Sequence, residues 1–303
     1  MNNFNSGDSL GALSSSQISD YLSSIDDIDD AGYFSQGNVS GQGFFAVKKP
    51  YTHTGFILGF IPTIPLSLSG TTGTSAVTGI GQIQGDPAII GKRIKISLDK
   101  FYVHDYPGMG EHAILCEFSG KNQVAGETEE LRFALKFNAG DKASASLSGV
   151  PIFMGVTVGL DGISFEGRTI NVSNSLDEVV LATLDSSAFK NGLALINAAQ
   201  PALKPFSTLA AAAVQSTLKR KKNKQVHNFS LGLDFATGAT SARLRHGSYL
   251  VIQTDDSAGW NWGDFEWNGD AMALQVKVGV ARVIDFNYMI FGVSEFSQVP
   301  SVA

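Results

Sequence analysis

The chain has 303 residues, of which 43% are hydrophobic and 17% are charged, and its formal net charge at pH 7 is −6. A charged fraction below the ~25% of an average globular domain, together with 33 glycines, favours a β-rich protein with many turns. This composition argues against a helical bundle or coiled coil, which needs many Glu, Lys and Arg residues. The negative charge argues against nucleic-acid binding. Because Cys116 is the only cysteine, intrachain disulfides and a cysteine-based zinc site are excluded.

The first 46 residues differ in charge from the rest of the chain. They contain six of the 28 acidic residues and no Lys or Arg, so the remaining 22 acids balance the 22 bases. We therefore expect residues 1–46 to be an acidic, Ser-rich leader and residues 47–303 to be a single domain. No basic stretch precedes an apolar one as in a secretory signal, and no apolar run reaches the ~18 residues of a membrane-spanning helix. With a lone thiol, these features predict a cytoplasmic protein.

A short amphipathic helix is predicted in this leader, because apolar residues recur at helical spacing and Ser14 to Ser16 can cap its start. The apolar stripe consists of Ile18, Tyr21, Leu22, Ile25 and Ile28. The helix can cover an open end of the core, or it can dock on a neighbouring subunit or partner; disorder is the third alternative. If it docks, Ile18, Leu22 and Ile25 are interface residues. We expect removal of the leader to spare folding and to change association.

Residues 55–66 are strongly apolar, but Pro62 and Pro65 argue against a long helix and a central strand there. Residues 68–85 are too rich in Gly to form a strong strand. From residue 93 onwards, apolar and polar residues alternate as in half-buried strands. Strands are predicted over 93–104, 113–118, 131–137, 150–160, 162–172, 226–235, 248–254, 271–279 and 286–293.

Two features of the last third of the chain add to the predicted fold. The dipeptide Asn268-Gly269 predicts a hairpin that joins 264–267 to a strand with Met272, Leu274, Val276 and Val278 on one face. The segment 288–293 is apolar throughout, as in a central strand buried on both faces.

A helical insertion is predicted near 175–220. A capping box at 175–178 opens helical periodicity over 176–199, and Ser207 can cap a second helix that ends at Leu218. Strands and helices do not alternate along the chain. The predicted fold class is therefore mainly β: an antiparallel β-sandwich of about ten strands with this helical insertion.

Motifs for catalysis or metal binding are incomplete. The glycines at 79, 81, 85 and 91 miss the spacing of both phosphate-binding loops. His104, Asp105, Glu111 and His112 flank one turn, but adjacent residues of a strand face opposite sides. The segment 264–275 resembles a calcium loop with the wrong third and twelfth residues. Cys116 lies in a strand pattern that predicts a buried, inert thiol. We therefore predict no catalytic residue, metal site or cofactor.

The three tryptophans lie within eight residues, at Trp260, Trp262 and Trp267, with Phe265 on the same strand face as Trp267. Such a cluster can be core, a protein interface or a carbohydrate site, and we select these four residues as interface candidates. The basic run 219–224 is typical of a solvated helix end; contact with anionic lipid or nucleic acid is the alternative.

The sequence thus favours a non-enzymatic β-sandwich that acts through protein contacts, as part of an assembly with a protein partner or with itself. One alternative is a membrane-active, pore-forming-like protein, since 65–85 and 142–160 are poor in charge and partly alternating. The other is an enzyme whose site is assembled only by the fold. A membrane contact is compatible with the sequence, no nucleic-acid partner is expected, and a small-molecule ligand is not identified.

Overall fold

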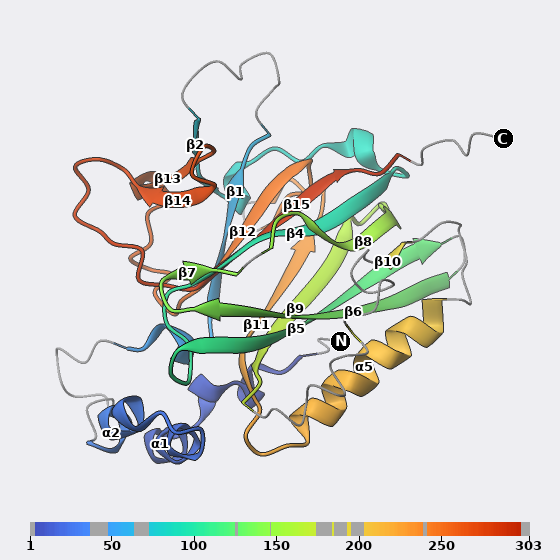
Figure 1. Cartoon of the computed structure of the whole chain (residues 1–303). Helices are drawn as coiled ribbons and strands as arrows, with labels where there is room; N and C mark the ends of the chain where they lie inside the picture. The colour runs from blue at the N-terminus through green and yellow to red at the C-terminus, as the bar shows by residue number, and fades with distance from the viewer. Residues whose placement is uncertain are drawn as a thin grey trace.

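The computed structural model describes residues 4–36, 48–63, 73–124, 127–145, 147–173, 184, 193–194, 203–238 and 241–297. Within them the fold is mainly antiparallel β, as the sequence predicts (Figure 1). The strands are β1 Phe56–Ile61, β2 Thr74–Ala76, β3 Thr78–Gly79, β4 Arg93–Val103, β5 Glu111–Val124, β6 Glu127–Gly140, β7 Ala143–Ser144, β8 Val150–Thr157, β9 Ile163–Asn171, β10 Leu193–Ala194, β11 Lys224–Leu233, β12 Gly247–Gln253, β13 Phe265–Asn268, β14 Ala273–Val276 and β15 Tyr288–Glu295. The α-helices that matter below are α1 Ser15–Ser24, α2 Ile28–Ser35 and α5 Leu203–Leu218.

Three sheets organise these strands. The large sheet runs β10-β8-β4-β15-β12-β1-β3, with β7 attached to β4, and the second sheet runs β11-β9-β5-β6. These two sheets form the sandwich, and aromatic rings fill the space between them. Phe118 and Phe165 stack in the four-stranded sheet, and Phe165 meets Phe291 of the large sheet edge-on at 5.1 Å between ring centroids.

A third, smaller sheet of order β14-β13-β2 lies on the other side of the large sheet. A second apolar cluster joins them: Leu250 and Ile290 of the large sheet pack with Phe265 and Leu274 of the small one. Strand β15 contributes Phe291 to the main core and Ile290 to the second cluster, so it is buried on both faces. The apolar run from 288 to 293 predicted this placement.

Two local predictions are wrong in detail. Residues 56–61 form strand β1, which pairs with β12 along its length and with β3 at Gly59 and Phe60, because Pro62 ends the strand instead of interrupting it. The predicted hairpin at Asn268 exists, but its loop spans 269–272, since Asn268 pairs with Ala273. Met272 therefore lies in the loop, with a positive φ of 46°.

The described part of the leader forms two α-helices where one was predicted. Ser14 caps α1 and forms a capping box with Gln17, as the sequence suggests. Asp26 then adopts a positive φ of 63°, which ends the first helix, and Asp27 caps α2. Six buried apolar side chains of the leader belong to the main core cluster; they are Leu10, Ile18, Tyr21, Leu22, Ala31 and Phe34. This burial opposes the expectation that the leader is dispensable for folding.

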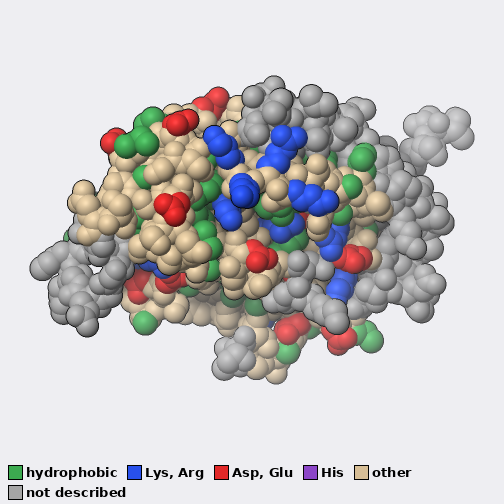
Figure 2. Space-filling view, turned by 90° about the horizontal axis from the view of Figure 1, so that it is seen from below, with side chains coloured by type: hydrophobic (Ala, Val, Ile, Leu, Met, Phe, Trp, Pro, Cys, Tyr) green, Lys and Arg blue, Asp and Glu red, His purple; other side chains and the backbone are tan. Residues whose placement is uncertain are grey.

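The helix α5 covers the β6 edge of the four-stranded sheet, on the face shown in Figure 2. It begins at Leu203, so Pro205 lies in its first turn, where proline is tolerated, and Ser207 is inside the helix instead of capping it. The Ser207 hydroxyl accepts a hydrogen bond from the Arg132 backbone N–H at 3.1 Å. The helix predicted over 176–199 falls almost wholly outside the described residues. None of the described helices combines the length and the apolarity that crossing a bilayer requires.

Candidate functional site

The tryptophan region contains a compact aromatic stack, defined here as Trp260, Trp262, Phe265 and Phe286. Trp260 stacks on Phe265 at 5.1 Å with an interplanar angle of 13°, and it meets Phe286 and Trp262 edge-on at 5.1 and 5.5 Å. The Arg282 guanidinium carbon lies 4.4 Å from the Trp260 ring centroid and 5.2 Å from that of Phe265. Cation–π contact of this kind holds the segment around residue 282 against the stack.

Two glycines allow the stack to lie close to the large sheet. A Cβ atom on Gly59 of β1 would come within 2.6 Å of the Trp262 ring, and one on Gly79 of β3 would come within 3.1 Å. The missing Cβ at Gly59 lets this indole rest directly on the backbone of β1, and Gly79 gives it a close approach to β3. The position of Trp262 is fixed by this contact.

The acidic residues near the stack are engaged with other side chains. Asp264 forms an ion pair with Arg282 at 3.4 Å and accepts a hydrogen bond from the Asn261 amide at 2.7 Å. Among the described residues, no group of three or more His, Cys, Asp or Glu side chains is arranged to hold a metal ion. The two histidines that flank the β4–β5 turn have different partners. The His112 side chain bonds Asp141, whereas His104 bonds Asn287 through its backbone N–H.

Exposed apolar side chains recur along the chain between Phe265 and Phe286 of the stack. Met272 is 48% exposed, Val283 is 65% exposed and Val278 is fully exposed. We call residues 272–283 the contact segment. In the described part of the chain, the other large apolar side chains with comparable exposure are spread over separate elements; they are Ile28, Met109, Leu160 and Leu209. Alternation along the sequence did not reveal this segment, because it placed Met272 and Val278 on one face of a predicted strand over 271–279.

The predicted interface residues divide into two groups. Trp260, Trp262 and Trp267 are half-buried and pack against the second apolar cluster, whereas Phe265 is fully buried within it. In the leader, Ile18 and Leu22 are buried in the main core, and half-buried Ile25 packs against it. The structure thus separates the leader residues from the tryptophans. Ile18, Leu22 and Phe265 are buried in the core of their own chain, so their side chains are not on a contact surface.

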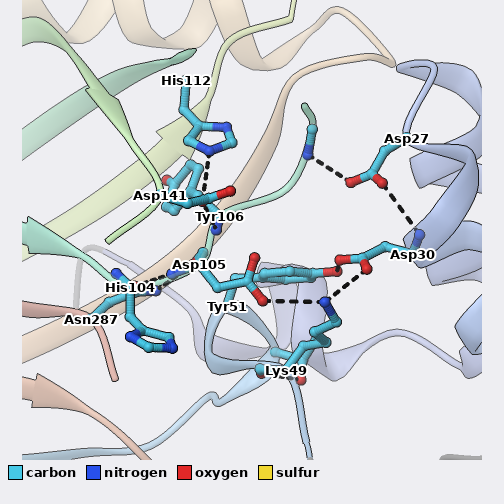
Figure 3. Close-up of polar contacts among 12 residues, drawn as sticks. Asp27, Asp30, Lys49, Tyr51, His104, Asp105, Tyr106, His112, Asp141 and Asn287 are labelled. Atoms are coloured by element: carbon cyan, nitrogen blue, oxygen red, sulfur yellow. Dashed lines mark hydrogen bonds and ion pairs between the residues drawn. The ribbon is translucent and has the colours of Figure 1, made fainter. Parts of the chain in front are cut away.

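A polar network fastens the leader to one end of the sandwich (Figure 3). The Tyr51 hydroxyl donates to the Asp30 carboxylate at 2.5 Å, and the Lys49 ammonium lies 2.7 Å from Asp30 and 3.4 Å from Asp105. Burial raises the pKa of Asp105. Burial also opposes the charge of Lys49, but its bonds to the two carboxylates raise its pKa above the usual range. The network is therefore a structural clamp whose charges are paired.

A second set of contacts extends this clamp to the turn after β4. Asp27 accepts a hydrogen bond from the Gly108 backbone at 2.9 Å, and Asp141 accepts from the Tyr106 backbone at 3.2 Å. The His112 Nε2 atom lies 2.9 Å from the same Asp141 carboxylate (Figure 3). These partners are distant in sequence, so no local motif could have identified them.

A cleft of about 360 Å³ opens where the leader meets the start of β1 and the outer face of β9 and β11. Phe4, Phe56, Ser6 and Glu166 are among the residues that line it. Its volume is near the lower end of the ~300–1,000 Å³ typical of small-molecule sites. The walls of this cleft come from four separate segments, so no local pattern in the sequence reveals it.

Comparison of the chain with models of known protein families, with curated proteins and with solved structures found no match. The functional assignment therefore depends on the geometry of the chain itself.

Proposed function

We propose that this β-sandwich protein is non-enzymatic and acts through protein contacts, as a subunit of an assembly, with the contact segment on the aromatic stack as its contact surface. The observation that supports this most is the exposure of Met272, Val278 and Val283 within twelve residues of one another. Removing an exposed valine side chain from water stabilises a complex by roughly 1.5 kcal/mol or more. A concentration of such groups is typical of a contact site.

The contact segment is held by a rigid support, which favours binding. Arg282 is fixed by Trp260 on one side and by Asp264 on the other, and Val283 follows it directly. The Lys277 backbone N–H donates to the Asp264 carbonyl at 2.9 Å, next to Val278. Surfaces that are already ordered lose less conformational entropy when they bind, so these anchors increase the affinity available from a small apolar area.

The partner proposed first is a second copy of the chain. Soluble oligomers are most often built from identical subunits, and a twofold dimer requires only one self-complementary patch. Within the segment, Arg282 is already paired with Asp264, so this guanidinium adds no unpaired charge between two identical segments.

The experiment is sedimentation velocity over a range of protein concentrations. The wild-type chain is expected to show a faster species as concentration rises. A variant with Val278→Ser and Val283→Ser is expected to associate at least tenfold more weakly, because each serine removes roughly 1.5 kcal/mol of burial.

The matched control is Leu160→Ser, which changes an apolar side chain that is 79% exposed in the turn between β8 and β9. It is expected to associate like the wild type. A wild-type chain that stays monomeric at every concentration, or a control that weakens association as much as the double variant, would overturn the proposal.

A further inference from the structure

Helix α5 has an exposed face without charge. From Ser207 to Leu218 the helix contains no Asp, Glu, Lys or Arg. Its inner face, with Ala210, Ala213 and Val214, is buried. Its outer face carries Leu209, which is 43% exposed, among small and uncharged polar residues. A helix on the surface of a soluble domain usually carries charged residues on its outer face, so this composition indicates a different environment for α5.

A turn rich in lysine follows the helix directly. We call residues 219–224 the basic turn; five of its six residues are Lys or Arg. Asn223 is buried and fixes the turn, because its side chain donates to the Thr217 carbonyl at 2.9 Å and accepts from the Ser173 backbone at 3.0 Å. This anchor leaves Lys221 and Lys222 exposed.

The exposed lysine side chains of the basic turn form no ion pair within the described residues. None of the ion pairs formed among the described residues involves Lys219, Lys221 or Lys222. The helix dipole favours a cation in the last turn of α5, which accounts for Lys219. That effect decays within one turn and does not account for Lys221 and Lys222. Figure 2 shows Lys and Arg side chains gathered near the middle of the face that bears α5, with few acidic side chains among them.

We infer that the outer face of α5 and the basic turn form a docking surface for an anionic phospholipid bilayer. The lysines contact lipid phosphates and carboxylates, while the uncharged helix face, with Leu209, lies at the level of the headgroups. Each base close to such a membrane strengthens binding about fivefold. Charge is complementary, and the helix face brings no acidic group that the membrane would repel.

A bilayer fits this surface better than a nucleic acid does. Binding to a nucleic-acid duplex requires Lys and Arg side chains that are spread along the contacting element, so that they meet successive phosphates. Here the Lys and Arg side chains are concentrated at one end of α5. From Ser207 to Leu218 the helix itself carries no Lys or Arg. A surface with an uncharged part and a basic end is typical of interfacial membrane binding.

The test is cosedimentation of the full chain with phosphatidylcholine vesicles that contain either no phosphatidylserine or 30 mol% of it. The wild type is expected to bind only the anionic vesicles and to be released at high salt. A variant with Lys221→Gln and Lys222→Gln is expected to bind at least tenfold more weakly; both side chains are exposed, so folding is expected to be unaffected.

The matched control removes the same number of positive charges from the other sheet of the sandwich. Lys92→Gln with Lys95→Gln alters an exposed and a half-buried lysine at the start of β4 in the large sheet and is expected to bind like the wild type. The inference is overturned by failure to bind anionic vesicles, by equal weakening in the control, or by binding to a DNA duplex in place of the vesicles.

Discussion

Glu117 of β5 and Arg168 of β9 form an ion pair beneath the leader, in which Arg168 Nη2 and Nε lie 2.6 and 2.8 Å from the same carboxylate oxygen. Glu117 is fully buried, and Arg132 approaches its other oxygen at 3.4 Å. The Phe4 ring of the leader covers the guanidinium of Arg168 at 4.6 Å. The leader therefore shields charges of the sandwich from water.

Replacing Glu117 with Gln is expected to lower the free energy of unfolding by about 3–5 kcal/mol, because it leaves the buried guanidinium without its counter-charge. Urea unfolding measures the loss. Glu130→Gln is the matched control: its carboxylate pairs with Arg132 at 3.0 Å but is 49% exposed, so its loss is expected to stay below about 1 kcal/mol. Equal losses for the two variants would show that burial does not strengthen the Glu117 pair.

Leu22 tests whether the leader is part of the folded domain. Its side chain is fully buried in the main core, so Leu22→Ala is expected to destabilise the chain by about 2–5 kcal/mol. Ile28→Ala, in the same leader but at a side chain 63% exposed, is expected to change stability by no more than about 0.5 kcal/mol. Thermal unfolding compares the two. If Leu22→Ala behaves like Ile28→Ala, the leader is dispensable for folding, as its composition predicts.

Gly59 tests the close contact beneath Trp262. An alanine Cβ there would lie 2.6 Å from the indole ring, so the ring must move. Gly59→Ala is expected to cost about 1–3 kcal/mol and to alter tryptophan fluorescence and near-ultraviolet circular dichroism. The control is Gly232→Ala in β11, where an added Cβ meets no atom within 4 Å. Unchanged spectra for Gly59→Ala would contradict the described position of Trp262.

Protonation of His227 is expected to lower the free energy of unfolding in mild acid. Burial lowers the pKa of its imidazole from 6.5 to about 4, although its bond to the Gly55 carbonyl and the charge of Asp255 act in the opposite direction. Between these two values the unfolded chain binds a proton at this residue and the native chain does not. The free energy of unfolding is therefore expected to fall as the pH drops from about 6.5 to 4, by up to about 3 kcal/mol.

The measurement is urea unfolding at a series of pH values between 7 and 4. His227→Gln removes the titrating group, so the variant is expected to show a flatter dependence over that interval than the wild type. Identical slopes for the two proteins would mean that His227 is protonated in the native state at the same pH as in the unfolded chain.

Alternation of apolar residues predicted the sandwich strands correctly, because burial on one face constrains every second residue. Ile94, Ile96 and Leu98 of β4 are all buried, as their spacing required. The leader was harder to place. Its Ser and Asp residues predicted a solvated segment, but composition does not show that Leu10, Leu22 and Phe34 find space on the core.

The candidate site was predicted only in part. The three tryptophans were visible as a local cluster, but Arg282 and Phe286 contact Trp260 from 22 and 26 residues further along the chain, and nothing near those residues signals the contact. Val278 was predicted to lie in a strand over 271–279, since a short alternating pattern does not show that β14 ends at Val276. Likewise, the clamp between Asp30, Lys49 and Asp105 depends on tertiary proximity that no spacing encodes.

Site-directed cross-linking tests whether the contact segment meets an identical segment of another copy. Cys116 is the only cysteine, it is fully buried, and burial raises the pKa of its thiol, so it does not compete for the reagent. Val278→Cys introduces a single exposed thiol in the contact segment, and Leu160→Cys introduces one elsewhere. With a short bis-maleimide, the account predicts a covalent dimer from Val278→Cys and monomer from Leu160→Cys. Absence of a dimer from Val278→Cys, or equal yields from both variants, would contradict it.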